Sequence, residues 1–327
     1  MWRRPRHWSH FVGCSDSLKP IQTKLIAMTY IPKSWKVTRL AGALGAEIRG
    51  PDITNSSPKD IDAIKTLLHE HLVIFLPEQA PTVTAHVEFG KHFGHLEGHP
   101  NLDSNSSIPP EIFELSATKG GVADEWHADL TFQEQPALMS ILHMVDCPEE
   151  GGDTIWSSLY AAYEELSDPM QSLCNGLTAL HDALPHNRPE QMTTHPVVRT
   201  HPVTGRRALY VNEHFTRRIV EMNATESETF LTYLTKWVSN PRFTVRHKWQ
   251  PGTVAIWDNR CTQHFVLNDF VGERIIQRVT VVGDHVEAAE KAKWQPYIRP
   301  GRLSATSRHD RQLYMYLKSN GLMETES

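Results

Sequence analysis

Two short segments that lie far apart in the chain contain residue types that together bind a metal ion. The first, residues 126–129, has the sequence W-H-A-D, and the second, residues 257–264, ends at His264, which comes 137 residues after His127. Two imidazoles and one carboxylate are the ligand set that holds non-haem Fe(II) on one face and leaves the other face open. A fold that uses this set must bring His264 back beside His127 and Asp129.

The spacing within the first segment has a simple geometric interpretation. In an extended strand, residues i and i+2 point to the same face, so we expect His127 and Asp129 to face one point. An isolated H-x-D is a weak signal, because the chain has 19 histidines and such a pair more often has a structural or surface role. His264 alone is equally consistent with a hydrogen-bonded core histidine. The metal site is therefore a hypothesis that depends on the rest of the chain.

Two arginines follow His264 in an apolar run. Arg274 and Arg278 are four residues apart, so they share one face of the strand predicted at residues 274–282. Cations on one strand face repel each other unless an anion neutralises them. Either they form surface ion pairs or stay solvated, or one guanidinium forks onto the carboxylate of a bound organic acid. Thr154 offers a hydroxyl that can share this carboxylate; the alternative is a threonine that leaves a turn.

The hydrophobic pattern alternates between short strands and a few helices. Apolar runs of strand character occupy residues 35–49, 72–76, 254–257 and 274–282. Helical periodicity occupies residues 58–68, 83–93, 161–166, 169–177 and 225–238. Thr225 and Glu228 form a capping-box pair that opens the last of these helices. We expect loops at residues 101–110 and at residues 183–196, the second a mobile surface loop with three prolines.

This alternation predicts a mainly β fold with inserted helices, either a β-sandwich or a jelly roll. A doubly wound parallel sheet is disfavoured. No glycine-rich G-x-G-x-x-G or Walker sequence follows a strand, so a nucleotide cofactor is not expected.

Charge and cysteine content exclude several classes of partner. The net charge of −5 provides no overall electrostatic attraction to nucleic acid or to an anionic membrane. No apolar run approaches the roughly 20 residues of a membrane span. Four scattered cysteines without a C-x-x-C pair argue against a disulfide framework and a zinc-thiolate site. With 39% hydrophobic residues, the chain can bury a substantial core. We expect a soluble protein without nucleic-acid or membrane partners.

The first residues of the chain differ from the rest. Residues 1–27 are basic and poor in acids, and an unstructured extension is favoured over a mitochondrial transit peptide. We expect a cytoplasmic protein, or a mitochondrial one if residues 1–27 are a genuine leader. Residues 28–290 are predicted to form a single domain, and residues 291–327 a peripheral tail.

At these motifs the chain resembles the taurine dioxygenase family of Fe(II)- and 2-oxoglutarate-dependent oxygenases. The resemblance spans roughly residues 30–284. Its strongest stretches are residues 126–132 (W-H-A-D-L-T-F), 151–156 (G-G-D-T-I-W), 195–202 (H-P-V-V-R-T-H-P), 210–213 (Y-V-N-E) and 255–264 (A-I-W-D-N-R-C-T-Q-H). So many ordered matches are far more specific than a lone H-x-D.

The resemblance implies a fold and a reaction. The fold is a double-stranded β-helix, the clavaminate synthase-like jelly roll, in which His127, Asp129 and His264 hold Fe(II). The co-substrate 2-oxoglutarate chelates the iron, and Thr154 and Arg274 bind its distal carboxylate. O2 then reacts, 2-oxoglutarate loses CO2 to give succinate, and a C–H bond of the substrate is hydroxylated.

The resemblance also implies substrate-binding residues. Arg278 would face the substrate's anionic group, usually a sulfonate or a sulfate. His99 matches a substrate-binding histidine and Phe215 keeps an aromatic position, whereas Leu102 replaces a tyrosine and Ala123 an asparagine. The segment before His195 is shorter than the family's lid-like segment. Since two polar groups are lost, an organosulfonate or alkyl sulfate larger or more apolar than taurine is expected.

Two alternatives stay open at this point. The same chemistry on a carboxylate, such as an aryloxyalkanoate, would also use Arg278. A cupin-like jelly roll that binds a metal or a sugar without redox chemistry would need the three ligands but neither arginine. Besides a small anionic substrate, we expect the chain to associate with copies of itself as a homo-oligomer.

Overall fold

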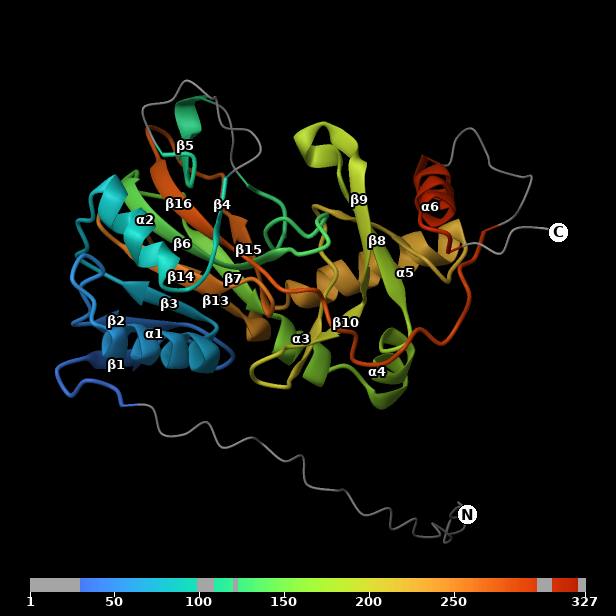
Figure 1. Ribbon diagram of the computed structural model, residues 1–327, viewed down its shortest axis with the longest axis horizontal. Coiled ribbons are helices and arrows are strands. Elements are labelled where there is room, and N and C mark those ends of the chain that lie inside the picture. The colour runs from blue at the N-terminus through green and yellow to red at the C-terminus, as the bar shows by residue number, and fades with distance from the viewer. Residues whose placement is uncertain (1–29, 99–108, 120–122, 299–307, 323–327) are drawn as a thin grey trace, which may run out of the picture.

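Mainly antiparallel strands form the framework of the protein, and the computed structural model describes residues 30–98, 109–119, 123–298 and 308–322 (Figure 1). The larger sheet has the strand order β1 (Lys36–Arg39), β2 (Ala46–Arg49), β3 (Val73–Leu76), β14 (Val254–Asp258), β6 (Ala137–Asp146), β16 (Ile275–Val282) and β4 (Leu96–Glu97). Strand β5 (Ile112–Ser116) also pairs with β16. All these pairs are antiparallel except β2 with β3.

Three smaller sheets complete the strand content of the described residues. The first has the order β13 (Thr244–His247), β7 (Thr154–Ser158) and β15 (Thr262–Val266). The second has the order β12 (Thr216–Ile219), β8 (Thr178–Ala183) and β9 (Arg188–Pro196). The third pairs β10 (Val198–Thr200) with β11 (Arg207–Leu209).

Helices α1 to α5 are inserted between strands, and α6 follows the last strand. They are α1 (Pro58–His71), α2 (Val83–Lys91), α3 (Leu159–Glu164), α4 (Asp168–Cys174), α5 (Ala224–Val238) and α6 (Arg308–Ser319). Short 3-10 turns occupy η1 (Ala117–Lys119), η2 (Leu184–His186) and η3 (Pro241–Phe243). Among the described residues, no helix is both long and apolar enough to cross a membrane.

The core lies between the larger sheet and the β13-β7-β15 sheet. Trp156 of β7 contacts Phe75 of β3 and Trp257 of β14, with ring centroids 5.2 Å and 5.7 Å away. All three side chains are almost fully buried in one hydrophobic cluster. Two sheets that share one core are the layers of a jelly roll, so the predicted fold class is confirmed.

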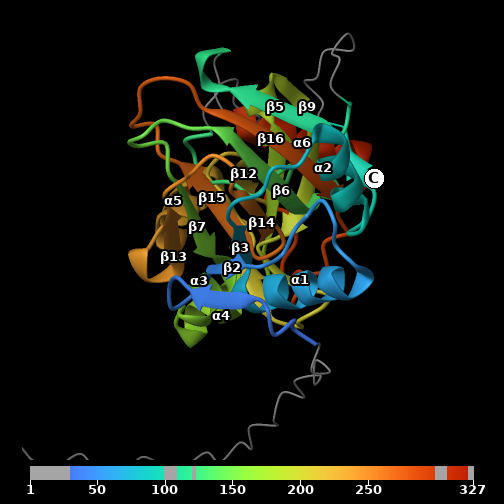
Figure 2. The same cartoon turned by 90° about the vertical axis from the view of Figure 1, so that its left-hand side faces the viewer.

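Helices α1 and α2 cover the other face of the larger sheet (Figure 2). Helix α1 begins at a capping box in which Ser57 caps the backbone of Asp60 and Asp60 caps that of Ser57, as the Ser-Pro signal indicates. Its apolar stripe packs into a second cluster with Ile74 and Ile256. This layer shields the strands that hold the site from solvent.

The structure corrects two predictions about element ends. Residues 35–49 do not form one strand: β1 and β2 form a hairpin, whose loop contains Gly45 at φ +93, a backbone angle that favours glycine. The N-cap of helix α5 lies two residues earlier than the Thr225–Glu228 pair predicts, because Asn223 is the N-cap and forms the capping box with Glu226.

The prediction of a mobile loop at residues 183–196 is wrong. This segment contains η2 and β9, and β9 pairs with β8 from Thr178↔Pro196 to Ala183↔Arg188. Strand β9 lies at the edge of its sheet, where prolines are tolerated because one side needs no hydrogen bonds. The prolines therefore mark an edge strand and a hairpin tip.

The predicted tail includes a packed helix. Leu313 and Leu317 of α6 are buried against Leu180 and Val220, and Asp310 pairs with Arg218 at 2.8 Å.

Residues 1–27 and most of the loop predicted at 101–110 lie outside the described residues. The domain bounds stay a prediction.

A buried histidine makes the stability of the fold dependent on pH. His86 of α2 is fully buried, and its Nε2–H donates to the Ile141 carbonyl of β6 at 3.1 Å. Burial, aided by the neighbouring His143, lowers the pKa of His86 from 6.5 to about 4. Between these pH values the unfolded chain binds a proton that the folded chain does not, so stability falls as the pH falls.

We expect His86→Gln to weaken this pH dependence. Glutamine can still donate to the Ile141 carbonyl, but it does not titrate. Urea unfolding between pH 7.5 and 5.0 should show a slope of unfolding free energy against pH that is smaller in the variant, by up to about 1.4 kcal/mol per pH unit below pH 6.5. Equal slopes in the two proteins would contradict the assignment.

Candidate metal centre and binding cavity

His127 and His264 form a hydrogen-bonded antiparallel pair. The His127 N–H donates to the His264 carbonyl at 3.1 Å, and the His264 N–H donates to the His127 carbonyl at 2.8 Å. Opposed residues in such a pair project their side chains to the same face. The two ring centroids are accordingly 4.0 Å apart. One backbone contact thus places two imidazoles side by side, across 137 residues of sequence.

A turn of the chain at residues 129–130 places the Asp129 carboxylate beside the two imidazoles. The expected strand alternation is wrong here, because His127 occupies an isolated bridge and the chain turns directly after it. Leu130 has φ +59, in the left-handed region that non-glycine residues rarely adopt. Asp129 Oδ1 lies 3.9 Å from His127 Nε2.

The three side chains form what we call the ligand cluster: His127, Asp129 and His264. One ligand atom from each lies within 4.8 Å of the others, and all three residues are buried. The structure therefore brings together the three residues that the sequence predicts.

The electrostatics of the ligand cluster suit a metal. Burial lowers the pKa of His127 to about 4 and holds that of His264 well below its usual value. Burial would raise the pKa of Asp129, but the Arg278 guanidinium and the two imidazoles offset this and hold it below the ordinary range. At neutral pH the set is two neutral imidazoles and one carboxylate, the forms that bind metals.

Hydrogen bonds around the ligand cluster leave bonding capacity for a metal. His127 Nδ1 lies 2.7 Å from the Glu125 carbonyl, which can only accept, so Nδ1 carries the proton and Nε2 is free to be a ligand. His264 Nδ1 is buried and has no hydrogen-bond partner in the described part of the chain. The residues present fit an Fe(II) ion held by two histidines and one carboxylate.

The ligand cluster lines a cavity of about 480 Å³. Much of its wall is apolar, formed by Phe113, Leu115, Leu130, Leu142, Phe215, Val266 and Ile276. Thr154, Arg274 and Arg278 line the same cavity. Thus the predicted metal ligands and the predicted anion-binding residues share one space.

Arg274 is a buried cation without an anionic partner among the described residues. It is 6% exposed, and its guanidinium reaches only the Gly152 carbonyl at 3.2 Å and the Thr154 hydroxyl at 3.5 Å. Burial lowers its pKa to about 10. Trp249 Nε1 donates to the Thr154 hydroxyl at 2.9 Å, which orients that hydroxyl. A buried, uncompensated charge is costly, so this corner suits the carboxylate of a ligand.

Arg278 contacts the ligand cluster directly. Its NH1 group donates to Asp129 Oδ1 at 2.7 Å, and its guanidinium lies over the Phe113 ring at 5.3 Å. Its Nε atom is buried without a hydrogen-bond partner in the described residues. Arg278 is therefore tied to Asp129 and retains donor capacity within the cavity.

The structure describes two of the four other residues that the sequence predicts to bind the substrate. Ala123 and Phe215 line the cavity. His99 and Leu102 lie outside the described residues.

Two cavity histidines were not predicted from the sequence. His214 lies with its ring centroid 5.5 Å from that of His127, and its Nδ1 pairs with Glu125 at 2.6 Å. His186 enters from η2, at the tip of the β8–β9 hairpin. The position of His214 directly before Phe215 is a signal that could have identified it, whereas His186 lies in the proline-containing segment 183–196, for which the sequence predicts a loop.

A second group of possible metal ligands, His201, Asp258 and Cys261, has a structural role instead. Both Asp258 oxygens bond to Arg260, at 2.9 Å and 2.6 Å, and His201 Nε2 donates to Asp258 at 3.0 Å. His201 Nδ1 accepts backbone N–H bonds from Val203 and Thr204. This buried network joins two of the sequence stretches that resemble the family.

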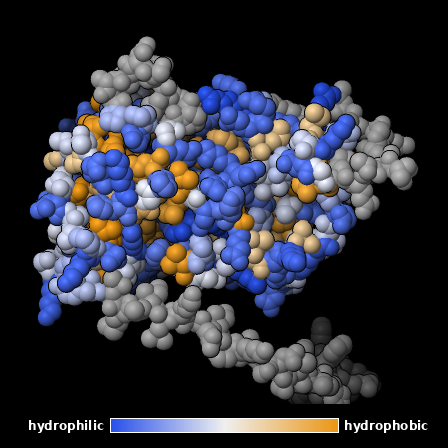
Figure 3. Space-filling view, viewed as in Figure 1, coloured by the Kyte–Doolittle hydropathy of each residue, from blue (hydrophilic) through white to orange (hydrophobic). Residues whose placement is uncertain are grey.

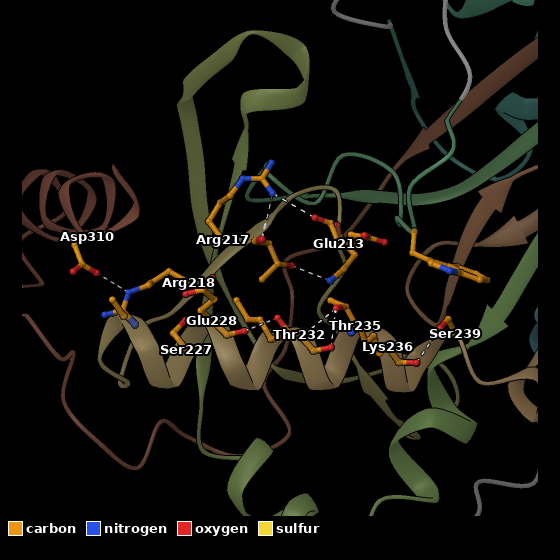
Figure 4. A pocket seen from close by; sticks show the side chains of 15 residues that line it. Glu213, Arg217, Arg218, Ser227, Glu228, Thr232, Thr235, Lys236, Ser239 and Asp310 are labelled. Atoms are coloured by element: carbon orange, nitrogen blue, oxygen red, sulfur yellow. Dashed lines mark hydrogen bonds and ion pairs between the residues drawn. The ribbon is translucent and has the colours of Figure 1, made fainter. Parts of the chain in front are cut away.

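A second, more open cavity of about 680 Å³ lies along α5 (Figure 4). Its polar side chains largely pair with each other and with neighbours: Arg218 with Asp310, and Arg217 with Asp182, each at 2.8 Å. It contains none of the ligand cluster. The smaller cavity is therefore the candidate site.

Comparisons with known proteins agree with this geometry. The pattern of the family described as "Taurine catabolism dioxygenase TauD, TfdA family" matches residues 36–280. The chain is 32% identical over 308 residues to an alkylsulfatase of Acinetobacter baylyi, covering 87% of this chain and 96% of the relative. It is 35% identical over 271 residues to an alpha-ketoglutarate-dependent sulfate ester dioxygenase of Pseudomonas putida, covering 75% of this chain and 88% of the relative. A taurine dioxygenase structure from Burkholderia xenovorans aligns with a TM-score of 0.71 and 37% identity, covering 78% of this chain and 93% of that one.

The ligand cluster generates a direct prediction. We expect His264→Gln to abolish tight binding of ferrous iron in anaerobic equilibrium dialysis, because two ligands remain. His195→Gln is a matched control, since His195 is equally buried but bonds the Gln133 carbonyl outside the ligand cluster. If both variants bound iron like the parent protein, the cluster would not be the metal site.

Proposed function

The chain belongs to the taurine catabolism dioxygenase TauD, TfdA family, and on that basis we propose that it hydroxylates a C–H bond of an organosulfonate or alkyl sulfate. It is an Fe(II)- and 2-oxoglutarate-dependent dioxygenase that also uses O2. The observation that most supports the proposal is the buried Arg274, which has no anionic partner in the described chain and shares a cavity with the ligand cluster. A binding protein without redox chemistry would not need this cation.

We assign His127, Asp129 and His264 as the iron ligands and catalytic centre. Bound Fe(II) would supply the site at which 2-oxoglutarate and O2 react, so that decarboxylation to succinate and CO2 is coupled to hydroxylation of the substrate. The chain itself binds and orients the reactants. Arg274 and Thr154 would bind the distal carboxylate of 2-oxoglutarate, because a guanidinium fork and a hydroxyl both donate to it.

The substrate would be oriented by Arg278. Its unpartnered Nε gives it donor capacity for an anionic head group while NH1 stays on Asp129. The apolar walls, which include Phe215 and Val266, would hold a hydrocarbon chain and exclude water. Ala123 adds apolar space at the wall. Hydroxylation at the carbon beside the head group gives an unstable product that releases sulfite or sulfate.

The relatives favour a sulfur-containing head group. They are named an alkylsulfatase, a sulfate ester dioxygenase and, in Saccharomyces cerevisiae, an alpha-ketoglutarate-dependent sulfonate dioxygenase that is 32% identical over 267 residues, covering 72% of this chain and 63% of the relative. The carboxylate alternative is not favoured by these relatives. His99 and Leu102 stay predicted substrate contacts, and the cytoplasmic location and the homo-oligomer also stay predictions.

Succinate release across a panel of substrates tests the proposal. The panel would contain alkyl sulfates and alkyl sulfonates of increasing chain length, taurine, and aryloxyalkanoates. We expect the strongest stimulation from a sulfate or sulfonate with an apolar chain, because the cavity wall is mainly apolar. Stimulation by aryloxyalkanoates alone would overturn the substrate assignment.

Single arginine variants separate the two anion sites. We expect Arg274→Ala to raise the KM for 2-oxoglutarate by about 10- to 100-fold, the loss of a charge-assisted bond worth ~1.5–3 kcal/mol. Arg278→Ala should chiefly raise the KM for the substrate. Arg206→Ala is the control, since Arg206 is exposed and pairs with Glu164 away from the cavity. Reversed effects of the two cavity variants would contradict the assigned roles.

A further inference from the structure

We infer that Asn259 is a positioning residue, which fixes the carboxylate of Asp129 through a directed chain of hydrogen bonds. The inference rests on the proposed function, because it assigns Asp129 to the metal. Asn259 lies in the W-D-N-R run of the second sequence segment, where neither the ligand cluster nor the cavity explains its presence. Its side chain is fully buried.

The orientation of the Asn259 amide is set by its partners. Its Oδ1 accepts from the Asp129 backbone N–H at 3.2 Å and from Trp257 Nε1 at 3.0 Å. Both partners can only donate, so the oxygen must face them and the amide nitrogen must face the other way. The first of these bonds holds the backbone of the turn at Asp129.

The amide nitrogen then sets the direction of a second bond. Asn259 Nδ2 donates to Ser140 Oγ at 3.0 Å, and Ser140 Oγ donates to Asp129 Oδ2 at 2.7 Å. A hydroxyl has one proton, and the Ser140 oxygen is already accepting from the amide. The Ser140 proton is therefore directed to the carboxylate, and Asn259 determines that direction.

This chain of bonds holds the carboxylate together with Arg278. Arg278 bonds Oδ1 while Ser140 bonds Oδ2, so rotation of the carboxylate is restrained at both oxygens. Asn259 and Ser140 are fully buried and Asp129 is 4% exposed, so water does not compete for these bonds. Metal ligands depend on such supporting bonds for their orientation.

The backbone of Asn259 is itself fixed by the larger sheet. Its N–H donates to the Leu138 carbonyl of β6 at 3.0 Å, directly after β14 ends. Strands β14 and β6 pair with Trp257 opposite Ser140, so Asn259 and Ser140 are both anchored to the same pair of strands. The neighbouring Asp258 is locked by Arg260. Few conformations other than the observed one are available to this side chain.

Asparagine is the residue that this arrangement requires. Aspartate has the same shape but cannot donate to Ser140, and it would place a second carboxylate beside Asp129. The Ser140 proton would then have two competing acceptors. Alanine would remove all three bonds of the side chain and leave Ser140 free to rotate.

The test measures metal binding without turnover. We expect Asn259→Ala and Asn259→Asp each to lower the affinity for Co(II), measured by competition with a chelator, by about 10- to 100-fold. The visible ligand-field spectrum of bound Co(II) should change in both variants. Ser140→Ala should act in the same direction, and the Ser140→Ala/Asn259→Ala double variant should lose less than the sum of the single losses, because the two residues act in one chain.

Asn212→Ala is the matched control. Asn212 is also a buried amide that bonds a hydroxyl, Thr131 Oγ1 at 3.0 Å, but it does not contact the ligand cluster. We expect it to lower thermal stability while keeping the affinity and spectrum of Co(II). If Asn259→Ala does not fold, Asn259→Asp and Ser140→Ala provide the same readout.

The outcomes separate this inference from the proposed function. Parent-like Co(II) affinity and spectrum in folded Asn259 variants would overturn the positioning role, even if the parent protein oxidises alkyl sulfates. Weakened Co(II) binding in these variants, with no substrate-dependent succinate release by the parent protein, would support positioning and count against the proposed function.

Discussion

The backbone pairing of His127 with His264 is the contact on which the rest of the site depends. It joins the turn-bearing segment of residues 127–130 to the edge strand β15, and its two backbone hydrogen bonds set both imidazoles on one face. Asp129 is then brought in by the turn, with Leu130 in a left-handed conformation. The backbone thus brings the three residues of the ligand cluster together, and side-chain hydrogen bonds then orient His127 and Asp129.

The cavity that contains the ligand cluster also has an imbalance of buried charge. Asp129 is compensated by Arg278, whereas Arg274 has no acidic partner in the described chain. Burial penalises such a charge, and a bound carboxylate is the natural counterion. The position of Arg274 beside Thr154, in the cavity of the ligand cluster, links this electrostatic demand to the metal. In the proposed assignment, the distal carboxylate of 2-oxoglutarate would neutralise the Arg274 guanidinium.

The sequence predicted the fold class, the convergence of His127, Asp129 and His264 and the proximity of Arg274 to Thr154, because these depend on residue type, spacing and an ordered series of family-like motifs. It failed for the β8–β9 hairpin, since prolines indicate loops equally well as edge strands. It also missed His214 and the role of Asn259. Their partners, Glu125 and Ser140, are distant in the chain, and no periodicity relates them. Such contacts become visible only once the strands are paired.

The shared site for iron and 2-oxoglutarate is tested most directly by the visible absorption spectrum of the protein with Fe(II) and 2-oxoglutarate under anaerobic conditions. A keto acid that chelates iron gives a weak charge-transfer band. We predict that this band appears when 2-oxoglutarate is added to the iron-loaded protein. With 2-oxoglutarate in excess, its intensity should reach a maximum at one equivalent of iron per chain. Absence of the band, with bound iron confirmed by metal analysis, would contradict the shared site for iron and 2-oxoglutarate.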